Sequence, residues 1–98
     1  MRGVMRPINP SYSPEMETRD QLLGGDLKLS VIRRVFQSDQ RFVEGLAGLL
    51  RDGDVALFAD GVAVPEWKVR ELFRDGAVLT SLPEYVLHLT DKGAQKIA

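Results

Sequence analysis

The sequence predicts a small α+β domain with three to four helices and a carboxyl-terminal β-hairpin, preceded by an extended, proline-containing arm. Three observations predict this fold. Apolar residues recur at helical spacing between Ser38 and Gly53 and again over residues 65–75. Two runs typical of strands, 77–82 and 85–90, then follow each other with a short turn between them. Prolines interrupt the amino-terminal stretch, as is typical of an extended segment.

The amino-terminal stretch, residues 1–25, carries three prolines with Asn and Ser between them, which disfavours both a helix and a central strand. We therefore expect an extended or mobile arm there, and one folded domain over residues 26–98. The domain begins with a helix that is capped by Asp26 or Ser30 and runs to about Gln37.

The second helix begins at Ser38 and ends at Gly53, where glycine supplies the left-handed conformation that helix ends prefer. Its apolar residues form one stripe on the helical wheel, made of Phe42, Val43, Leu46, Leu49 and Leu50. Gly45 and Gly48 lie within this helix, and each costs about 1 kcal/mol of helix propensity relative to Ala. Close approach of another backbone is one reason to keep glycine at such positions.

The segment over residues 54–64 is compatible with two structures. Its β-branched residues and the dipeptide Asp60-Gly61 favour a hairpin with strands over 55–59 and 62–64. Its position directly before a helix favours a short helical turn leading into a loop, as in a helix-turn-helix unit. Propensity alone leaves both structures open.

The third helix covers residues 65–75, with Pro65 at the first helical position. Its buried side is formed by Val69, Leu72 and Phe73. Its opposite side carries Trp67, Arg70 and Arg74, with Lys68 beside them. The two strands of the expected hairpin follow, and Thr90 caps a last short helix.

Composition and motifs argue against several classes of protein. The chain has no Cys, a formal net charge of −1, and no apolar stretch near the roughly 20 residues that a membrane-spanning helix needs. We expect a cytoplasmic, non-membrane protein. His88 is the sole histidine and is expected to face away from the core, and no phosphate-binding loop or nucleophile motif is present. We expect no catalytic residue, no metal and no cofactor.

The stretch "ELFRDGAVLTSLPEYVLHLTDKGA" resembles the carboxyl-terminal half of a winged helix-turn-helix domain of the kind found in many bacterial regulators. In that superfamily a recognition helix ends in Leu, a charged pair and Gly, and then a strand, a wing and a second strand follow. The second strand closes in "LT", a charged residue or two, and Gly. The corresponding residues here are Leu72, Asp75-Gly76, Val78, Tyr85, Leu87, Leu89-Thr90 and Lys92-Gly93.

The resemblance implies a winged-helix-like, transcription-regulatory protein that reads duplex DNA with helix 65–75. The residues that would contact DNA or another partner are Trp67, Lys68, Arg70, Arg74 and Lys92. The near-neutral charge favours an alternative, a protein–protein interaction or adaptor module on the same scaffold, and a homodimer is compatible with either function. A further alternative is an α+β domain in which residues 55–64 and 77–90 join one antiparallel sheet.

Overall fold

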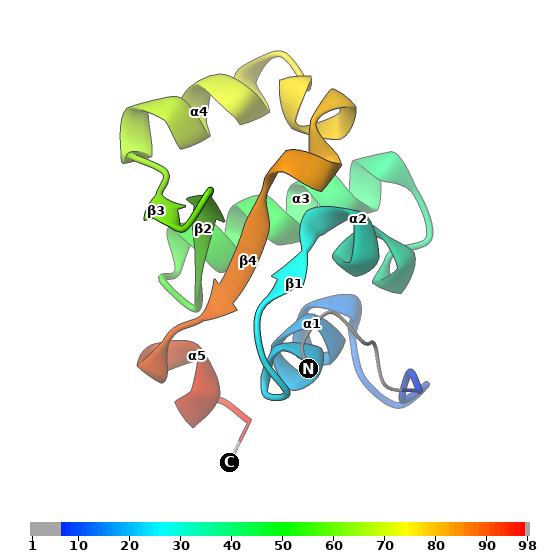
Figure 1. Ribbon diagram of the computed structural model, residues 1–98. Helices are drawn as coiled ribbons and strands as arrows, with labels where there is room; N and C mark the ends of the chain where they lie inside the picture. Colours follow the sequence, from blue (N-terminus) through cyan, green and yellow to red (C-terminus); the bar gives the residue numbers. More distant parts are fainter. Residues whose placement is uncertain (1–6, 98) are drawn as a thin grey trace.

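The computed structural model describes residues 7–97, in which a four-stranded antiparallel sheet is combined with five α-helices (Figure 1). The elements in chain order are α1 (Pro14–Leu22), β1 (Leu27–Lys28), α2 (Leu29–Ile32), η1 (Arg33–Val35), α3 (Asp39–Arg51), β2 (Val55–Ala59), β3 (Val62–Ala63), α4 (Glu66–Arg74), η2 (Ala77–Thr80), η3 (Leu82–Glu84), β4 (Val86–Leu89) and α5 (Asp91–Gln95), where η marks a 3₁₀ helix. The sequence therefore predicted the class, a small mixed α+β domain.

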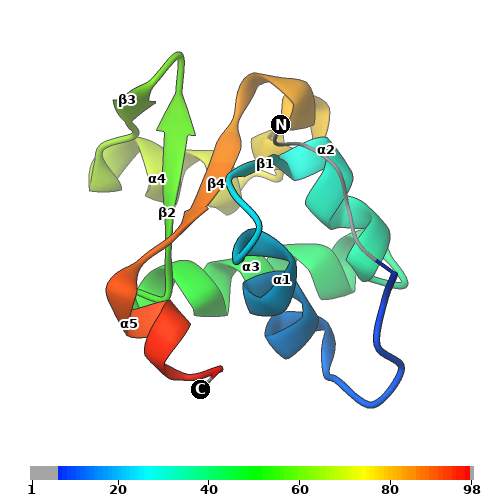
Figure 2. The ribbon, with the colours of Figure 1, turned by 60° about the horizontal axis from the view of Figure 1, so that its bottom comes forward.

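The sheet has the strand order β1-β4-β2-β3, and every neighbouring pair is antiparallel. Leu57 of β2 lies opposite Leu87 of β4 and both are buried, whereas the next residue along β4, His88, is exposed. Successive side chains of a strand point to opposite faces, so one face of the sheet is buried and the other is open. Figures 1 and 2 show α1 and α3 together on one side of the sheet.

The ambiguous segment after α3 is a hairpin. β2 pairs with β3 across Asp60-Gly61, whose φ angles of 52° and 77° are both positive. A type I′ turn requires this conformation at both positions, and Asp-Gly adopts it readily. The turn chemistry thus decided between the two structures that the sequence left open, in favour of the hairpin.

Helix α3 forms the centre of the hydrophobic core. The Ser38 hydroxyl accepts a hydrogen bond from the Arg41 amide at 3.1 Å and so caps the first turn. Phe42 and Leu46 are fully buried, and the Phe42 ring meets the Phe36 ring edge to face, with 5.6 Å between centroids. Gly45 sits directly under the Phe36 ring, which explains one of the two glycines in this helix.

The expected extended conformation of residues 1–25 is wrong for residues 14–22, which form helix α1. Pro14 occupies the first helical position, where its missing amide costs nothing, and Ser13 caps the helix. The prediction failed because it treated Pro14 as a residue that interrupts a helix, whereas Pro14 begins one. Thr18 is fully buried, as is Glu17, whose carboxylate accepts a hydrogen bond from the Gln21 amide at 2.6 Å. The part of the arm over residues 1–6 lies outside the described residues.

Helix α1 is tied to the rest of the protein through Asp54, whose side chain is buried. The Asp54 carboxylate lies 3.2 Å from Arg19 of α1 and 2.8 Å from Lys96, which follows α5. A buried carboxylate is costly unless it is paired, and removing one partner from such a group is strongly destabilising. Asp54 therefore joins α1 and the residue after α5 to the start of β2.

The expected carboxyl-terminal hairpin is also wrong. Residues 77–84 form the 3₁₀ helices η2 and η3 instead of a strand, and Gly76, with φ 75°, turns the chain out of α4. β4 pairs with β1 and β2 instead. The alternative of one antiparallel sheet is confirmed for 55–59, 62–63 and 86–89. The first expected helix is likewise shorter, since Leu27–Lys28 is strand β1.

Candidate functional site

Helix α4 carries four of the five residues that the sequence nominated for partner binding. It follows β3 and extends along the top of the molecule in Figure 1. Leu72 is its one fully buried residue, while Trp67 keeps 65% of its surface exposed. An exposed indole of this kind is uncommon, because a large aromatic surface normally gains free energy from burial.

The charges of α4 largely pair with each other. Arg70 donates a hydrogen bond to Glu66 at 2.9 Å, and Lys68 lies 3.8 Å from Glu71. These pairs are exposed and so contribute little stability, and a stronger anionic partner can replace the carboxylates. Arg74 forms no ion pair within residues 7–97. The surface of α4 is accordingly of mixed sign.

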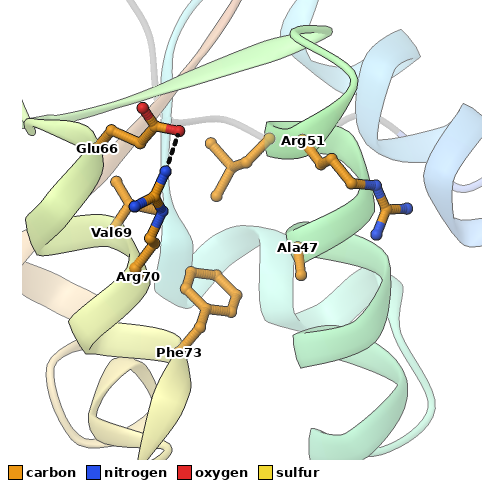
Figure 3. A pocket seen from close by; sticks show the side chains of 7 residues that line it. Ala47, Arg51, Glu66, Val69, Arg70 and Phe73 are labelled. Atoms are coloured by element: carbon orange, nitrogen blue, oxygen red, sulfur yellow. Dashed lines mark hydrogen bonds and ion pairs between the residues drawn. The ribbon is translucent and has the colours of Figure 1, made fainter.

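A groove of about 400 Å³ separates α4 from α3 (Figure 3). Its apolar lining consists of Ala47, Leu50, Val69 and Phe73, each of them half-buried. Its charged lining consists of Arg51 and Arg70, with Glu66 held by Arg70. Val69 and Phe73, expected on the buried side of the helix, pack against the hydrophobic core and are half-buried, because they also line the groove.

Lys92, the fifth nominated residue, is not part of this surface. It lies on α5, which follows the Leu89 end of β4, whereas α4 lies beyond the opposite end of β2 (Figure 1). The "LTDKG" motif around Lys92 connects β4 to α5 and packs on the residues between α3 and β2. The Thr90 hydroxyl accepts from the Gly93 amide at 3.1 Å and donates to the Gly53 carbonyl at 2.6 Å. Gly93 packs so tightly on the Asp54 carbonyl that no side chain fits there.

A second surface rich in arginine, outside the five nominated residues, lies on α2, η1 and α3, where Arg33 pairs with Asp39 and Arg41 with Glu44. Residues 36–38 form a tight turn between η1 and α3, and Gln40, Arg41 and Glu44 are exposed on the first turns of α3. Residues 29–51 contain four arginines, at 33, 34, 41 and 51, against two acidic residues, at 39 and 44. This local excess of arginine, opposite the apolar stripe of α3, is the feature of the sequence that could have indicated the surface.

His88 lies on the open face of the sheet, as expected, with its Nδ1 atom 2.8 Å from an Asp26 carboxylate oxygen. Its ring also meets Phe58 edge to face. Within residues 7–97, no three His, Asp or Glu side chains are grouped as metal ligands. No helix in the described part of the chain is long and apolar enough to span a bilayer.

No protein-family model, curated protein or solved structure matches this chain.

Proposed function

We propose that the protein binds duplex DNA as a winged-helix-like domain, with α3 in the major groove in place of the expected helix 65–75. One observation carries the proposal. The chain runs through α2 and η1, a tight turn and α3, and then through two strands, β2 and β4, that pair antiparallel beside β1. This is the order helix, turn, recognition helix, strand, wing, strand, with residues 60–85 as an enlarged wing that contains α4.

We assign the recognition role to α3 instead of α4 because of the elements that precede each helix. A recognition helix is the second helix of a helix-turn-helix unit, and α4 is preceded by the β2–β3 hairpin. α3 is preceded by a helical element and a tight turn. The resemblance of "LHLTDKG" to the end of a wing also fits this frame, because β4 then serves as the strand that closes the wing.

The charges support the same surface. Phosphate contacts supply much of the affinity for DNA, so the binding face needs an excess of Lys or Arg. Arg34 and Arg41 are exposed beside the first turn of α3, where helix-turn-helix proteins contact bases and phosphates. Gln40, Arg41 and Glu44 are exposed in the amino-terminal half of α3, outside the groove with α4, which involves residues 47–51 of this helix.

The test is binding to a randomised duplex pool at low salt, followed by salt titration of any selected sequence. We expect log affinity to fall linearly with log salt, and Arg34→Ala to flatten the slope by about one unit if it contacts a phosphate. Arg41→Ala should cost roughly 1–3 kcal/mol if it reads a base. Lys92→Ala, at the other end of the sheet, is the matched control.

Selection of no sequence, with no affinity above that of an acidic control protein, would refute DNA binding. Equal losses for Arg41→Ala and Lys92→Ala would refute the placement of α3 in the groove. A loss confined to Arg70→Ala and Arg74→Ala would return the recognition role to α4.

A further inference from the structure

We propose that α1 is a detachable helix, which opens as a unit away from α3, η1 and β4 while residues 27–97 stay folded. These three elements contact α1 in the closed fold, and Figures 1 and 2 show the helix beside α3 on one side of the sheet. Opening would uncover the surface on which α1 lies, so α1 controls access to that surface. The inference does not rest on DNA binding, because it concerns how α1 is held to the fold.

The face that α1 buries is mostly polar. Of its four buried residues, Glu17, Thr18 and Gln21 are polar and Leu22 is apolar. By contrast, every residue that α3 buries is apolar or glycine. Burial of apolar surface drives packing, whereas a buried polar group exchanges its hydrogen bonds with water for hydrogen bonds within the protein and gains little. Docking therefore stabilises α1 much less than it stabilises α3.

The buried polar side chains of α1 are satisfied from nearby in the sequence. The Glu17 carboxylate accepts hydrogen bonds from the Asn9 backbone amide at 2.9 Å and from the Gln21 side-chain amide at 2.6 Å. The Thr18 hydroxyl donates to the Pro14 carbonyl at 2.8 Å. These three bonds join residues of the same amino-terminal segment. They can therefore move with α1, and they do not hold it to the sheet or to α3.

An ion pair ties α1 to the rest of the protein. Arg19 Nη1 lies 3.2 Å from the buried Asp54 carboxylate, while Arg19 Nε is buried without a hydrogen-bond partner in the described part of the chain. Lys96 Nζ lies 2.8 Å from the same carboxylate. Asp54 thus keeps one cationic partner when α1 leaves. Since an unpaired buried carboxylate is costly, this second partner makes the opening of α1 easier.

A glycine pair supplies the hinge. Gly24 and Gly25 lie between α1 and β1, and Gly25 has a φ angle of 130°, which residues with side chains rarely adopt. Two successive glycines allow the chain to change direction there at little cost. With 9 residues, α1 is too short to be a stable helix alone, so it is expected to lose its helical hydrogen bonds when it opens.

The test is native-state hydrogen exchange of the full chain, followed amide by amide with NMR over a series of low urea concentrations. We expect the amides of Thr18–Leu22 to exchange together, at least about tenfold faster than those of Leu46 and Leu49 in α3. Their rates should also depend less steeply on urea, because the opening of α1 exposes less surface than global unfolding does.

Two variants that each remove one cation from Asp54 separate local from global opening. The Arg19 contact is broken when α1 opens, so Arg19→Ala should speed exchange in α1 by about tenfold or more. The Lys96 contact is kept when α1 opens and is lost only on global unfolding. Lys96→Ala should therefore speed exchange at Leu46 and Leu49, but leave exchange in α1 unchanged or slower.

The proposal is overturned if α1 and α3 exchange at equal rates with equal urea dependence, because α1 would then open only with the whole protein. It is overturned equally if Arg19→Ala and Lys96→Ala speed exchange in α1 by the same factor. Unrelated rates along Thr18–Leu22 with no urea dependence would mean that single turns fray, which also contradicts opening as a unit. The wild-type measurement needs no variant and no DNA, so it decides the proposal separately from DNA binding.

Discussion

Gly45 and Gly48 stand one turn apart on α3 but differ in what a side chain would meet. A Cβ atom on Gly45 would lie 2.5 Å from Cε2 and 3.0 Å from Cζ of the Phe36 ring, closer than packed carbons approach. The Phe36 ring is buried and held edge to face by Phe42, so it cannot simply swing away. At Gly48 the nearest atom is the mobile end of Arg51, at 3.5 Å.

Replacement by Ala should therefore have different effects at the two positions. Both variants gain about 1 kcal/mol of helix propensity, because both glycines lie in the helix interior. Only Gly45→Ala forces the core to accommodate an extra carbon, which typically costs about 1–3 kcal/mol. We expect Gly48→Ala to be more stable than the wild type by about 1 kcal/mol, and Gly45→Ala to be less stable than Gly48→Ala by about 1–3 kcal/mol.

Urea unfolding of the three proteins, with equal slopes as the check on two-state behaviour, measures this difference. Equal stabilities of Gly45→Ala and Gly48→Ala, within about 0.5 kcal/mol, would mean that Phe36 does not pack on α3 as described.

The remaining predictions concern packing and the connection from β4 to α5. Leu46→Ala should lower the free energy of unfolding by about 2–5 kcal/mol, because Leu46 is fully buried. Phe73→Ala should lower it clearly less, because Phe73 is only half-buried and lines the groove. Urea melts compare the two variants, and equal losses of stability would mean that Phe73 is as buried as Leu46. Thr90→Val should cost about 1–2 kcal/mol in the same assay, since it removes the α5 cap and the bond to Gly53. Gly93→Ala should be more damaging than Thr90→Val, and a wild-type melting temperature for it would contradict the contact with Asp54.

Several local features could be read from the sequence because their causes lie within a few residues. Ser38 caps α3, and the stripe from Phe42 to Leu49 faces the core. Helical hydrogen bonds join residues four apart, so helical periodicity is written into consecutive residues. The exposed position of Trp67 follows from the same periodicity, because the apolar residues of α4 define the side that turns inward.

The partners of each element depended on contacts between distant residues. β4 was expected to pair with residues 77–82, only a few positions away, but it pairs with Leu27–Lys28 and with β2. Strand pairing depends on which apolar faces can be buried together, and the residues next to a strand in the sequence do not indicate its partner. The α3–α4 groove could not be predicted for the same reason. The sequence of each helix indicates its apolar stripe, but not the distance between the two helices.

By itself the sequence determined the composition class, the helices α3 and α4, and the side of α4 that faces solvent. The tertiary structure alone decided that the segment after α3 is a hairpin, that residues 77–84 leave the sheet, and that Lys92 lies apart from Trp67. The physical reason is the range of the interactions. Caps, turns and helical periods act over a few residues, whereas the buried Asp54 with Arg19 and Lys96 joins segments that only folding brings together.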